Sequence, residues 1–110
     1  MEITGAIFDF DGTLFDSMHI WHGIRDRFLD HIGLTLSDDD KAAFRGLYLL
    51  ESLVLAKERF AMKQSTEELL AMFFDYIKGR YLEEAVPKND IIPFLEKLRQ
   101  KGVKMGIATA

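Results

Sequence analysis

The sequence contains no cysteine, so the chain can form neither a disulfide bond nor a thiolate metal site, and it has no thiol nucleophile. It also lacks a block of lysine and arginine at either end. Its 14 basic and 18 acidic residues give a net charge of -4, which argues against nucleic acid as a partner. No apolar run approaches the length that spans a bilayer, and the first ten residues do not resemble a signal peptide. We therefore expect a cytoplasmic protein that binds neither nucleic acid nor membrane.

The residues that are present suit one folded domain. Of the 110 residues, 48% are hydrophobic and 29% are charged, which are ordinary values for a globular chain. An apolar run over residues 6–10 stops at Asp11-Gly12 and predicts a short buried strand followed by a loop. Residues 103–110 predict a second buried strand, and the segment before it predicts a helix that Asp90 caps and Gly102 ends.

Between the two strands, residues 17–82 predict a bundle of helices. The first is an amphipathic helix of about four turns, which Asp16 or Ser17 caps and Gly33 ends. Its inner face carries apolar residues at three- and four-residue spacing: Trp21, Ile24, Phe28 and Ile32. Further helices begin near residues 37, 49 and 65.

The order of strand, helical insertion, helix and strand predicts an α/β core that is incomplete. Two short strands cannot form a stable parallel sheet, because such a sheet needs more strands and helices on both faces. A complete domain also seldom ends inside a buried apolar strand. We therefore expect these residues to be the N-terminal portion of a larger core.

Two carboxylates follow the first predicted strand. Asp9 and Asp11 are two residues apart, so the strand pleat would point both side chains the same way. The C-terminal ends of parallel strands are where open α/β sheets bind ligands, and paired carboxylates with water and phosphate suit Mg²⁺. Gly12 lets the backbone turn closely around a bound group, and the Thr13 hydroxyl can donate to a phosphate oxygen. This pattern predicts a magnesium and phosphate site.

The segment Ile7-Phe8-Asp9-Phe10-Asp11-Gly12-Thr13-Leu14 resembles the first motif of the haloacid dehalogenase-like (HAD) phosphatases, in which DxDGT follows an apolar strand. The continuation Phe15-Asp16-Ser17 is similar to members that insert a helical cap, such as phosphoglycolate phosphatases and β-phosphoglucomutases. The resemblance implies a partial HAD-like, Rossmann-like core over residues 1–16 and 83–110. It implies a helical cap domain over residues 17–82.

The resemblance also implies roles for individual residues. Asp9 would attack phosphorus and form an aspartyl-phosphate, and Asp11 would protonate the leaving oxygen and then activate water. Magnesium would be held by the Asp9 carboxylate and by the backbone carbonyl of Asp11. Gly106-Ile107-Ala108-Thr109 resembles the second motif of the family, so the Thr109 hydroxyl would hold a phosphoryl oxygen.

The third and fourth motifs of the family supply a lysine and acidic metal ligands, and neither motif occurs in these 110 residues. We therefore expect the intact protein to be a Mg-dependent phosphatase of a small phosphorylated metabolite, and the 110-residue chain alone to turn over little or nothing. Three alternatives stay open: a phosphomutase, a non-catalytic helical interaction module, and half of a split enzyme that a second chain completes. For the chain alone we also expect self-association through the strand edge after Thr109.

Overall fold

The computed structural model describes residues 2–109, and the chain forms two compact units. The first, here called the core unit, comprises Met1–Trp21 and Tyr81–Ala110. The second, here called the helical unit, comprises His22–Arg80. The core unit is therefore built from both ends of the chain, and the helical unit is an insertion within it.

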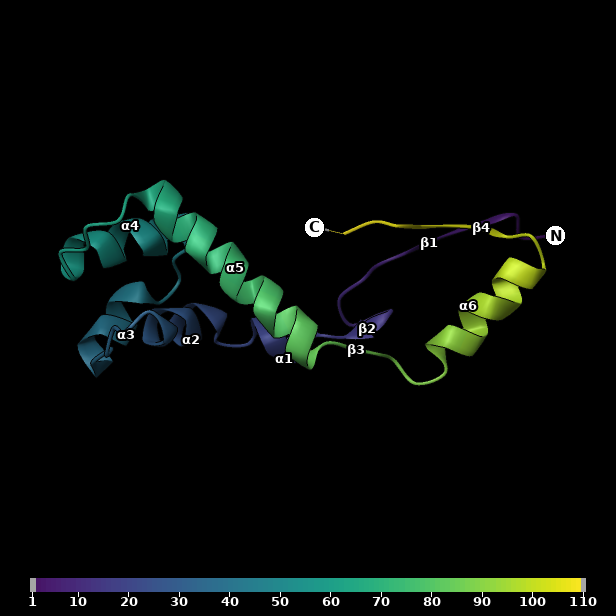
Figure 1. The fold of residues 1–110 in the computed structure, drawn as a ribbon, viewed down its shortest axis with the longest axis horizontal. Coiled ribbons are helices and arrows are strands. Elements are labelled where there is room, and N and C mark those ends of the chain that lie inside the picture. Colours follow the sequence, from purple (N-terminus) through teal and green to yellow (C-terminus); the bar gives the residue numbers. More distant parts are fainter. Residues whose placement is uncertain (1, 110) are drawn as a thin grey trace. The chain divides into compact units, whose positions relative to one another are not determined.

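A parallel pair of strands forms the centre of the core unit. Strand β1 (Gly5–Phe8) pairs with β4 (Lys104–Ile107), with Gly5 opposite Lys104 and Phe8 opposite Ile107. The pairing continues at its far end, where the Ala108 N–H donates to the Phe8 carbonyl at 2.9 Å. Helix α6 (Ile91–Gln100) leads into β4 and runs alongside the two strands (Figure 1). The predicted α/β core with two parallel strands is confirmed.

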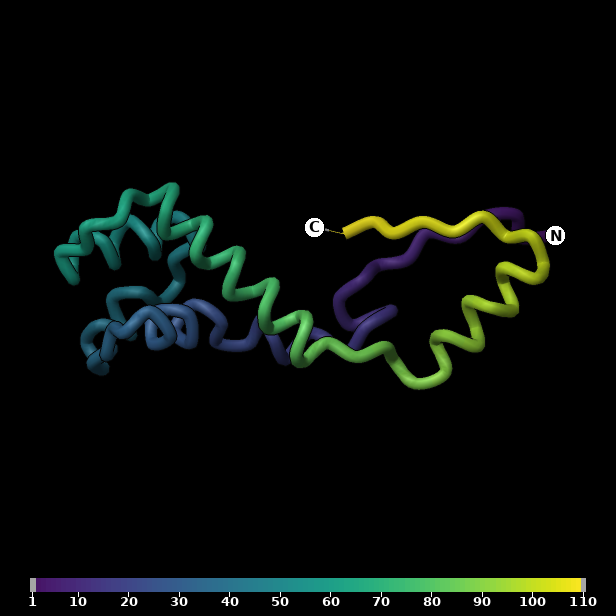
Figure 2. Tube along the Cα trace, in the orientation of Figure 1, coloured from purple at the N-terminus to yellow at the C-terminus, as the bar shows by residue number. Residues whose placement is uncertain are grey.

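A second pair of short strands joins the segments that lead into and out of the helical insertion. Strand β2 (Phe15–Asp16) pairs antiparallel with β3 (Val86–Pro87), and the Lys88 N–H donates to the Leu14 carbonyl at 2.9 Å. The sequence predicted only a break in this region. The tube in Figure 2 shows the chain reversing after β1 to enter β2.

The prediction that both long strands are buried is wrong for the part of the chain that the structure describes. All four residues of β4 are exposed, and Ile7 in β1 is 79% exposed. The helix α6 contributes a contact on one side, where the Phe94 ring meets the Phe8 ring edge-on with centroids 6.4 Å apart. Two strands and one helix leave apolar sheet surface exposed. A parallel sheet is normally covered by helices on both faces, which agrees with the expectation from the sequence that this core is incomplete.

The helical unit contains α2 (Ile24–His31), α3 (Asp38–Phe44), α4 (Leu49–Arg59) and most of α5 (Thr66–Glu84), which continues into the core unit. In Figure 1 the first three of these helices gather beside the first half of α5. The Phe28 ring of α2 meets the Phe73 ring of α5 edge-on at 5.3 Å. The fully buried apolar side chains of this unit come from all four helices: Phe28, Leu29, Phe44, Leu53, Ala56, Leu69 and Phe73.

The single four-turn helix predicted after residue 17 is wrong. The chain instead forms α1 (Met18–Trp21) and then α2, with Gly23 between them at a φ of 64°. A left-handed residue cannot continue a right-handed helix, so the helix breaks there although the apolar spacing runs on. The predicted helix end at Gly33 is confirmed, since its φ is 96° and its N–H donates to the Asp30 carbonyl.

The predicted starts of the next helices agree with the hydrogen bonds at their ends. The Ser37 hydroxyl accepts from the Asp40 N–H, and the Asp40 carboxylate accepts from the Ser37 N–H at 2.8 Å, which forms a capping box. Asp90 occupies the predicted N-cap position of α6, but its φ is 64° and its side chain makes no capping hydrogen bond. None of the helices in residues 2–109 combines the length and apolar character that crossing a bilayer needs.

Candidate active site

Both candidate carboxylates lie just beyond β1, which ends at Phe8. The predicted strand over residues 6–10 is therefore too long, and a strand pleat does not orient Asp11. A tight turn orients it instead. The Phe10 carbonyl accepts the N–H groups of Thr13, Leu14 and Phe15 at 3.3, 3.1 and 3.2 Å, and the Gly12 N–H donates to the Phe15 carbonyl at 2.9 Å. The chain thus folds back on itself directly after the strand.

Gly12 is the residue that this turn requires. Its φ is 78°, in the left-handed region that side chains with a Cβ rarely adopt. A Cβ at this position would also lie 3.0 Å from the Cγ of Met18. The conformational freedom of glycine and the close approach of Met18 both favour glycine here.

Three of the predicted site residues are exposed: Asp9, Thr13 and Thr109. The Asp9 carboxylate accepts from the Phe10 N–H at 3.0 Å. Thr109 follows Ala108, whose N–H donates to the carbonyl of Phe8, the residue before Asp9. The backbone of the second motif therefore runs beside the end of β1, at the same edge of the sheet as Asp9.

Asp11 differs from Asp9 in being partly buried and held by side chains. The Ser17 hydroxyl donates to Asp11 Oδ1 at 2.6 Å, and the Tyr81 hydroxyl donates to the same oxygen. All three residues belong to the core unit. Ser17 is fully buried and lies directly before α1, where its backbone carbonyl accepts the Ile20 N–H at 3.0 Å, so this residue joins the start of the helix to the Asp11 carboxylate.

Sequence reasoning missed Tyr81 as a site residue. It lies 70 positions from Asp11, near the end of α5, and no local motif marks it. Soon after Tyr81, strand β3 pairs with β2, which brings this part of the chain back beside the turn that contains Asp11. Burial and the hydrogen bond to Asp11 raise the pKa of the Tyr81 hydroxyl, and the Trp21 N–H partly opposes them. The phenol therefore stays protonated and acts as a donor to Asp11.

The oxygen atoms of this turn include the two carboxylates and the backbone carbonyl of Asp11, which are hard donors of the kind that Mg²⁺ accepts. Within residues 2–109, no group of three or more His, Cys, Asp or Glu side chains is placed to hold a metal ion. The described residues therefore supply only part of the ligand set that a magnesium ion at this turn would need.

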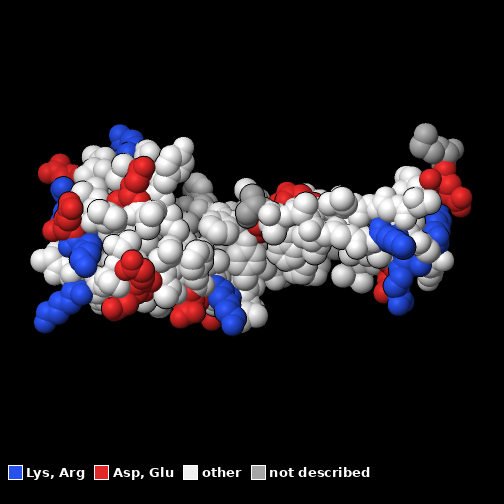
Figure 3. Space-filling model, turned by 90° about the horizontal axis from the view of Figure 1, so that it is seen from above, with Lys and Arg blue, Asp and Glu red and all other residues white. Residues whose placement is uncertain are grey.

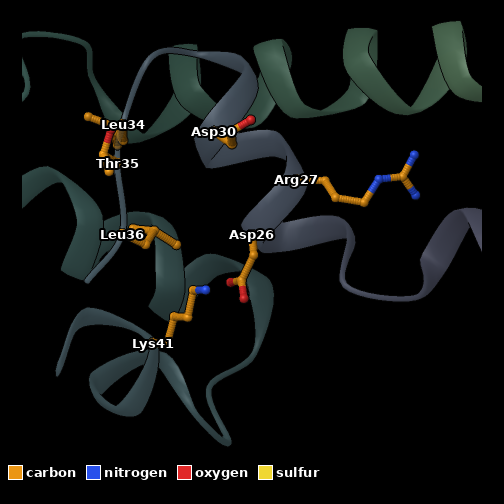
Figure 4. Close-up of a pocket in the computed structure, with 7 residues that line it drawn as sticks. All are labelled: Asp26, Arg27, Asp30, Leu34, Thr35, Leu36 and Lys41. Carbon is orange, nitrogen blue, oxygen red and sulfur yellow. The ribbon is translucent and has the colours of Figure 1, made fainter. Parts of the chain in front are cut away.

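The helical unit has a separate pocket between α2, the loop after it, and α3 (Figure 4). Its lining residues are Asp26, Arg27, Asp30, Leu34, Thr35, Leu36 and Lys41. In Figure 4 the side chains of Asp26 and Lys41 point toward each other, and Arg27 points away. Charges of both signs are also interspersed over the helical unit on the face in Figure 3. None of the lining residues is fully buried, so the pocket has no desolvated charge to recognise a ligand.

A parallel α/β core that is interrupted by a helical insertion carries acidic residues just after its first strand, at the strand ends where open α/β sheets bind ligands. The family model for haloacid dehalogenase-like hydrolases matches residues 6–110, and the chain belongs to this family. The predicted family resemblance is confirmed.

Individual relatives agree with this assignment. The chain is 26% identical over 114 residues to a protein named "Putative pyrophosphatase PpaX" from Caldanaerobacter subterraneus subsp. tengcongensis, covering 100% of this chain and 48% of that protein. A structure titled "putative beta-phosphoglucomutase" from Thermotoga maritima superposes with a TM-score of 0.69 at 23% identity, over 97% of this chain and 50% of that one. A haloacid dehalogenase-like hydrolase from Streptococcus pneumoniae gives a TM-score of 0.56 at 28% identity, over 97% and 49%.

The chain spans about half the length of the relatives it matches. The family model therefore establishes the family, and the solved structures agree with the fold of the described residues. The reaction, metal and substrate of the whole protein are matters for a proposal.

Proposed function

We propose that the chain carries the nucleophile and the acid/base group of a Mg-dependent phosphatase that acts on a small phosphorylated metabolite. One observation carries the proposal: Asp9 and the turn that holds Asp11 follow β1 directly, at the sheet edge beside which the backbone of Ala108 and Thr109 runs. The family membership supports the same reaction class. The exposure of Asp9 supports its role as nucleophile, because a nucleophile must be reachable by substrate.

In the proposed reaction, an oxygen of the Asp9 carboxylate attacks phosphorus while the bond from phosphorus to the leaving oxygen breaks. Asp11 gives its proton to that oxygen, which leaves the phosphoryl group on Asp9 as an aspartyl-phosphate. Asp11 then takes a proton from a water molecule that attacks phosphorus, and the bond from phosphorus to the Asp9 oxygen breaks. Phosphate is released, and both carboxyl groups return to their starting states. The hydroxyls of Thr13 and Thr109 donate to the phosphoryl oxygens.

The donors in the turn fit magnesium, since all of them are oxygen atoms and the Asp9 carboxylate is exposed. The Asp9 carboxylate and the Asp11 backbone carbonyl would hold the ion. When bound, it would neutralise negative charge on the phosphoryl oxygens.

The test measures phosphate release from p-nitrophenyl phosphate by the natural full-length protein, with and without Mg²⁺. We expect Mg-dependent turnover that Asp9→Asn abolishes, because an amide oxygen is too weak a nucleophile. Asp16→Asn is the matched control, because Asp16 is an exposed carboxylate on β2 outside the proposed site. Turnover that persists in Asp9→Asn would refute the role of Asp9.

The same assay separates the alternatives. A phosphomutase would pass the phosphoryl group from Asp9 to a substrate hydroxyl, so it would release little free phosphate. A helical interaction module would leave the protein inert toward phosphoesters with or without Mg²⁺. A split enzyme would gain turnover only with a second chain. A cytoplasmic location stays a prediction from the cysteine-free sequence.

A further inference from the structure

The Asp11 carboxylate is held from two distant parts of the chain through a single oxygen. The Ser17 hydroxyl donates to Oδ1 at 2.6 Å from the segment just before α1, and the Tyr81 hydroxyl donates to Oδ1 from the end of α5. Ser17 is fully buried and Tyr81 is partly buried. Two donors on one oxygen fix the rotation of the carboxyl group and distinguish its two oxygens.

The phenol of Tyr81 is itself fixed in place. The Trp21 indole N–H donates to the Tyr81 hydroxyl at 2.6 Å. The Trp21 ring also meets the Tyr81 ring edge-on at 6.3 Å, and the Phe10 ring lies 6.4 Å away on a tilted plane. These aromatic contacts hold the ring, while the indole hydrogen bond selects the direction of the hydroxyl.

The direction of this hydrogen-bond chain follows from the chemistry of its members. An indole N–H can only donate, so the Tyr81 oxygen must accept from Trp21. The one hydrogen of the phenol is then free to point at Asp11, which it does. The order is therefore Trp21 to Tyr81 to Asp11 Oδ1, and a proton on Asp11 belongs on its other oxygen, Oδ2.

We propose that Tyr81 is a positioning residue for Asp11, and that Trp21 orients it. The inference rests on the proposed function. The Tyr81 hydroxyl holds Oδ1 so that Oδ2 exchanges the proton in both steps: Oδ2 gives it to the leaving oxygen and later regains it from water. Tyr81 keeps its own proton throughout and does not contact the reacting atoms. The Ser17 hydroxyl, which precedes the helical unit in the sequence, donates to the same oxygen.

The proposal predicts a loss in kcat rather than in substrate affinity. Tyr81→Phe keeps the ring and its aromatic contacts but removes the donor to Asp11 and the acceptor for Trp21. Removing a hydrogen bond to a charged group that acts in the transition state should lower the rate by about ten- to a hundredfold. We expect kcat for p-nitrophenyl phosphate to fall by that factor in the natural full-length protein, with KM unchanged within about twofold.

Tyr76→Phe is the matched control. Tyr76 is another tyrosine of α5, but its ring packs against Phe28 and His31 in the helical unit. Removing the Tyr76 hydroxyl should leave kcat at the wild-type value. In the 110-residue chain Trp21 provides a second readout, because it is the one tryptophan in that sequence. Its emission should change in Tyr81→Phe and not in Tyr76→Phe.

A double variant tests whether Tyr81 acts through Asp11. In an Asp11→Asn background, adding Tyr81→Phe should cost almost nothing further, because the group that Tyr81 positions has already lost its function. If Tyr81→Phe fails to fold, Trp21→Phe carries the test, with a smaller loss in kcat expected.

Three results would overturn the inference. The first is equal kcat in Tyr81→Phe and Tyr76→Phe while Asp9→Asn is inactive, which would leave the proposed function intact. The second is an inactive wild type or an active Asp9→Asn, which would remove the proposed function together with the role of Tyr81. The third is additive losses in the double variant, which would assign Tyr81 a role independent of Asp11.

Discussion

Replacing Gly12 with alanine tests whether the turn after β1 depends on its left-handed backbone. The φ of 78° places any residue with a Cβ in a region that costs about 1–2 kcal/mol. The new Cβ would lie 3.0 Å from Met18 Cγ, which is too close. Met18 is 58% exposed, so its side chain can move at a cost of about 1 kcal/mol or less. We therefore expect Gly12→Ala to lower the free energy of unfolding of the core unit by about 1–3 kcal/mol.

The measurement is urea-induced unfolding followed by the fluorescence of Trp21, which lies in the same unit as Gly12. Gly106→Ala is the matched control, because Gly106 lies in β4 without a positive φ and a Cβ there would meet no atom within 4 Å. We expect the control to change stability by about 0.5 kcal/mol or less.

Met18→Ala separates the two costs. In this background the contact disappears but the φ penalty stays, so Gly12→Ala should still destabilise by about 1–2 kcal/mol. Equal stability of Gly12→Ala and Gly106→Ala would refute the claim that the turn requires glycine. Complete rescue by Met18→Ala would show that the contact alone, and not the backbone, selects glycine.

Two further predictions concern other parts of the chain. The Arg59 side chain, followed by the Ser37 N–H, lowers the pKa of Asp40 from its ordinary value, so this carboxylate stabilises the fold at neutral pH and loses that effect as the pH falls through the lowered pKa. Asp40→Asn should therefore lower the thermal midpoint near pH 7, and the difference from the wild type should shrink as the pH falls into the acid range. The exposed Ile7 and Ile107 and the free strand edges predict that the 110-residue chain self-associates, and a strictly monomeric species across a concentration series by ultracentrifugation would contradict this.

Features that depend on neighbouring residues could be predicted from the sequence. The capping box at Ser37 and the helix end at Gly33 each involve residues within one helical turn, and both agree with the structure. The acidic turn after β1 is equally local, because Asp9, Asp11 and Gly12 lie within four positions. The roles of these residues in catalysis stay predictions.

Features that depend on distant residues could not be predicted. The apolar spacing continues through Gly23, so periodicity alone gave no sign that α1 and α2 are separate helices. Strands β2 and β3 have two residues each, which is too short for a pattern. Tyr81 gave no signal because its partner is 70 positions away.

The short β2 and β3 pair explains how a long insertion can leave the acidic turn undisturbed. The pair joins Phe15 to Pro87 and Asp16 to Val86, so the segments on either side of the insertion are fixed to each other within the core unit. The cost of closing a loop rises only slowly with its length, so the insertion can vary in size at little thermodynamic cost once its ends are paired. The hydrogen bonds to Asp11 come from Ser17 and Tyr81, which belong to the core unit and flank the two ends of the helical unit in the sequence. The geometry of the candidate acid/base group therefore depends on the segments that flank the insertion rather than on what the insertion contains.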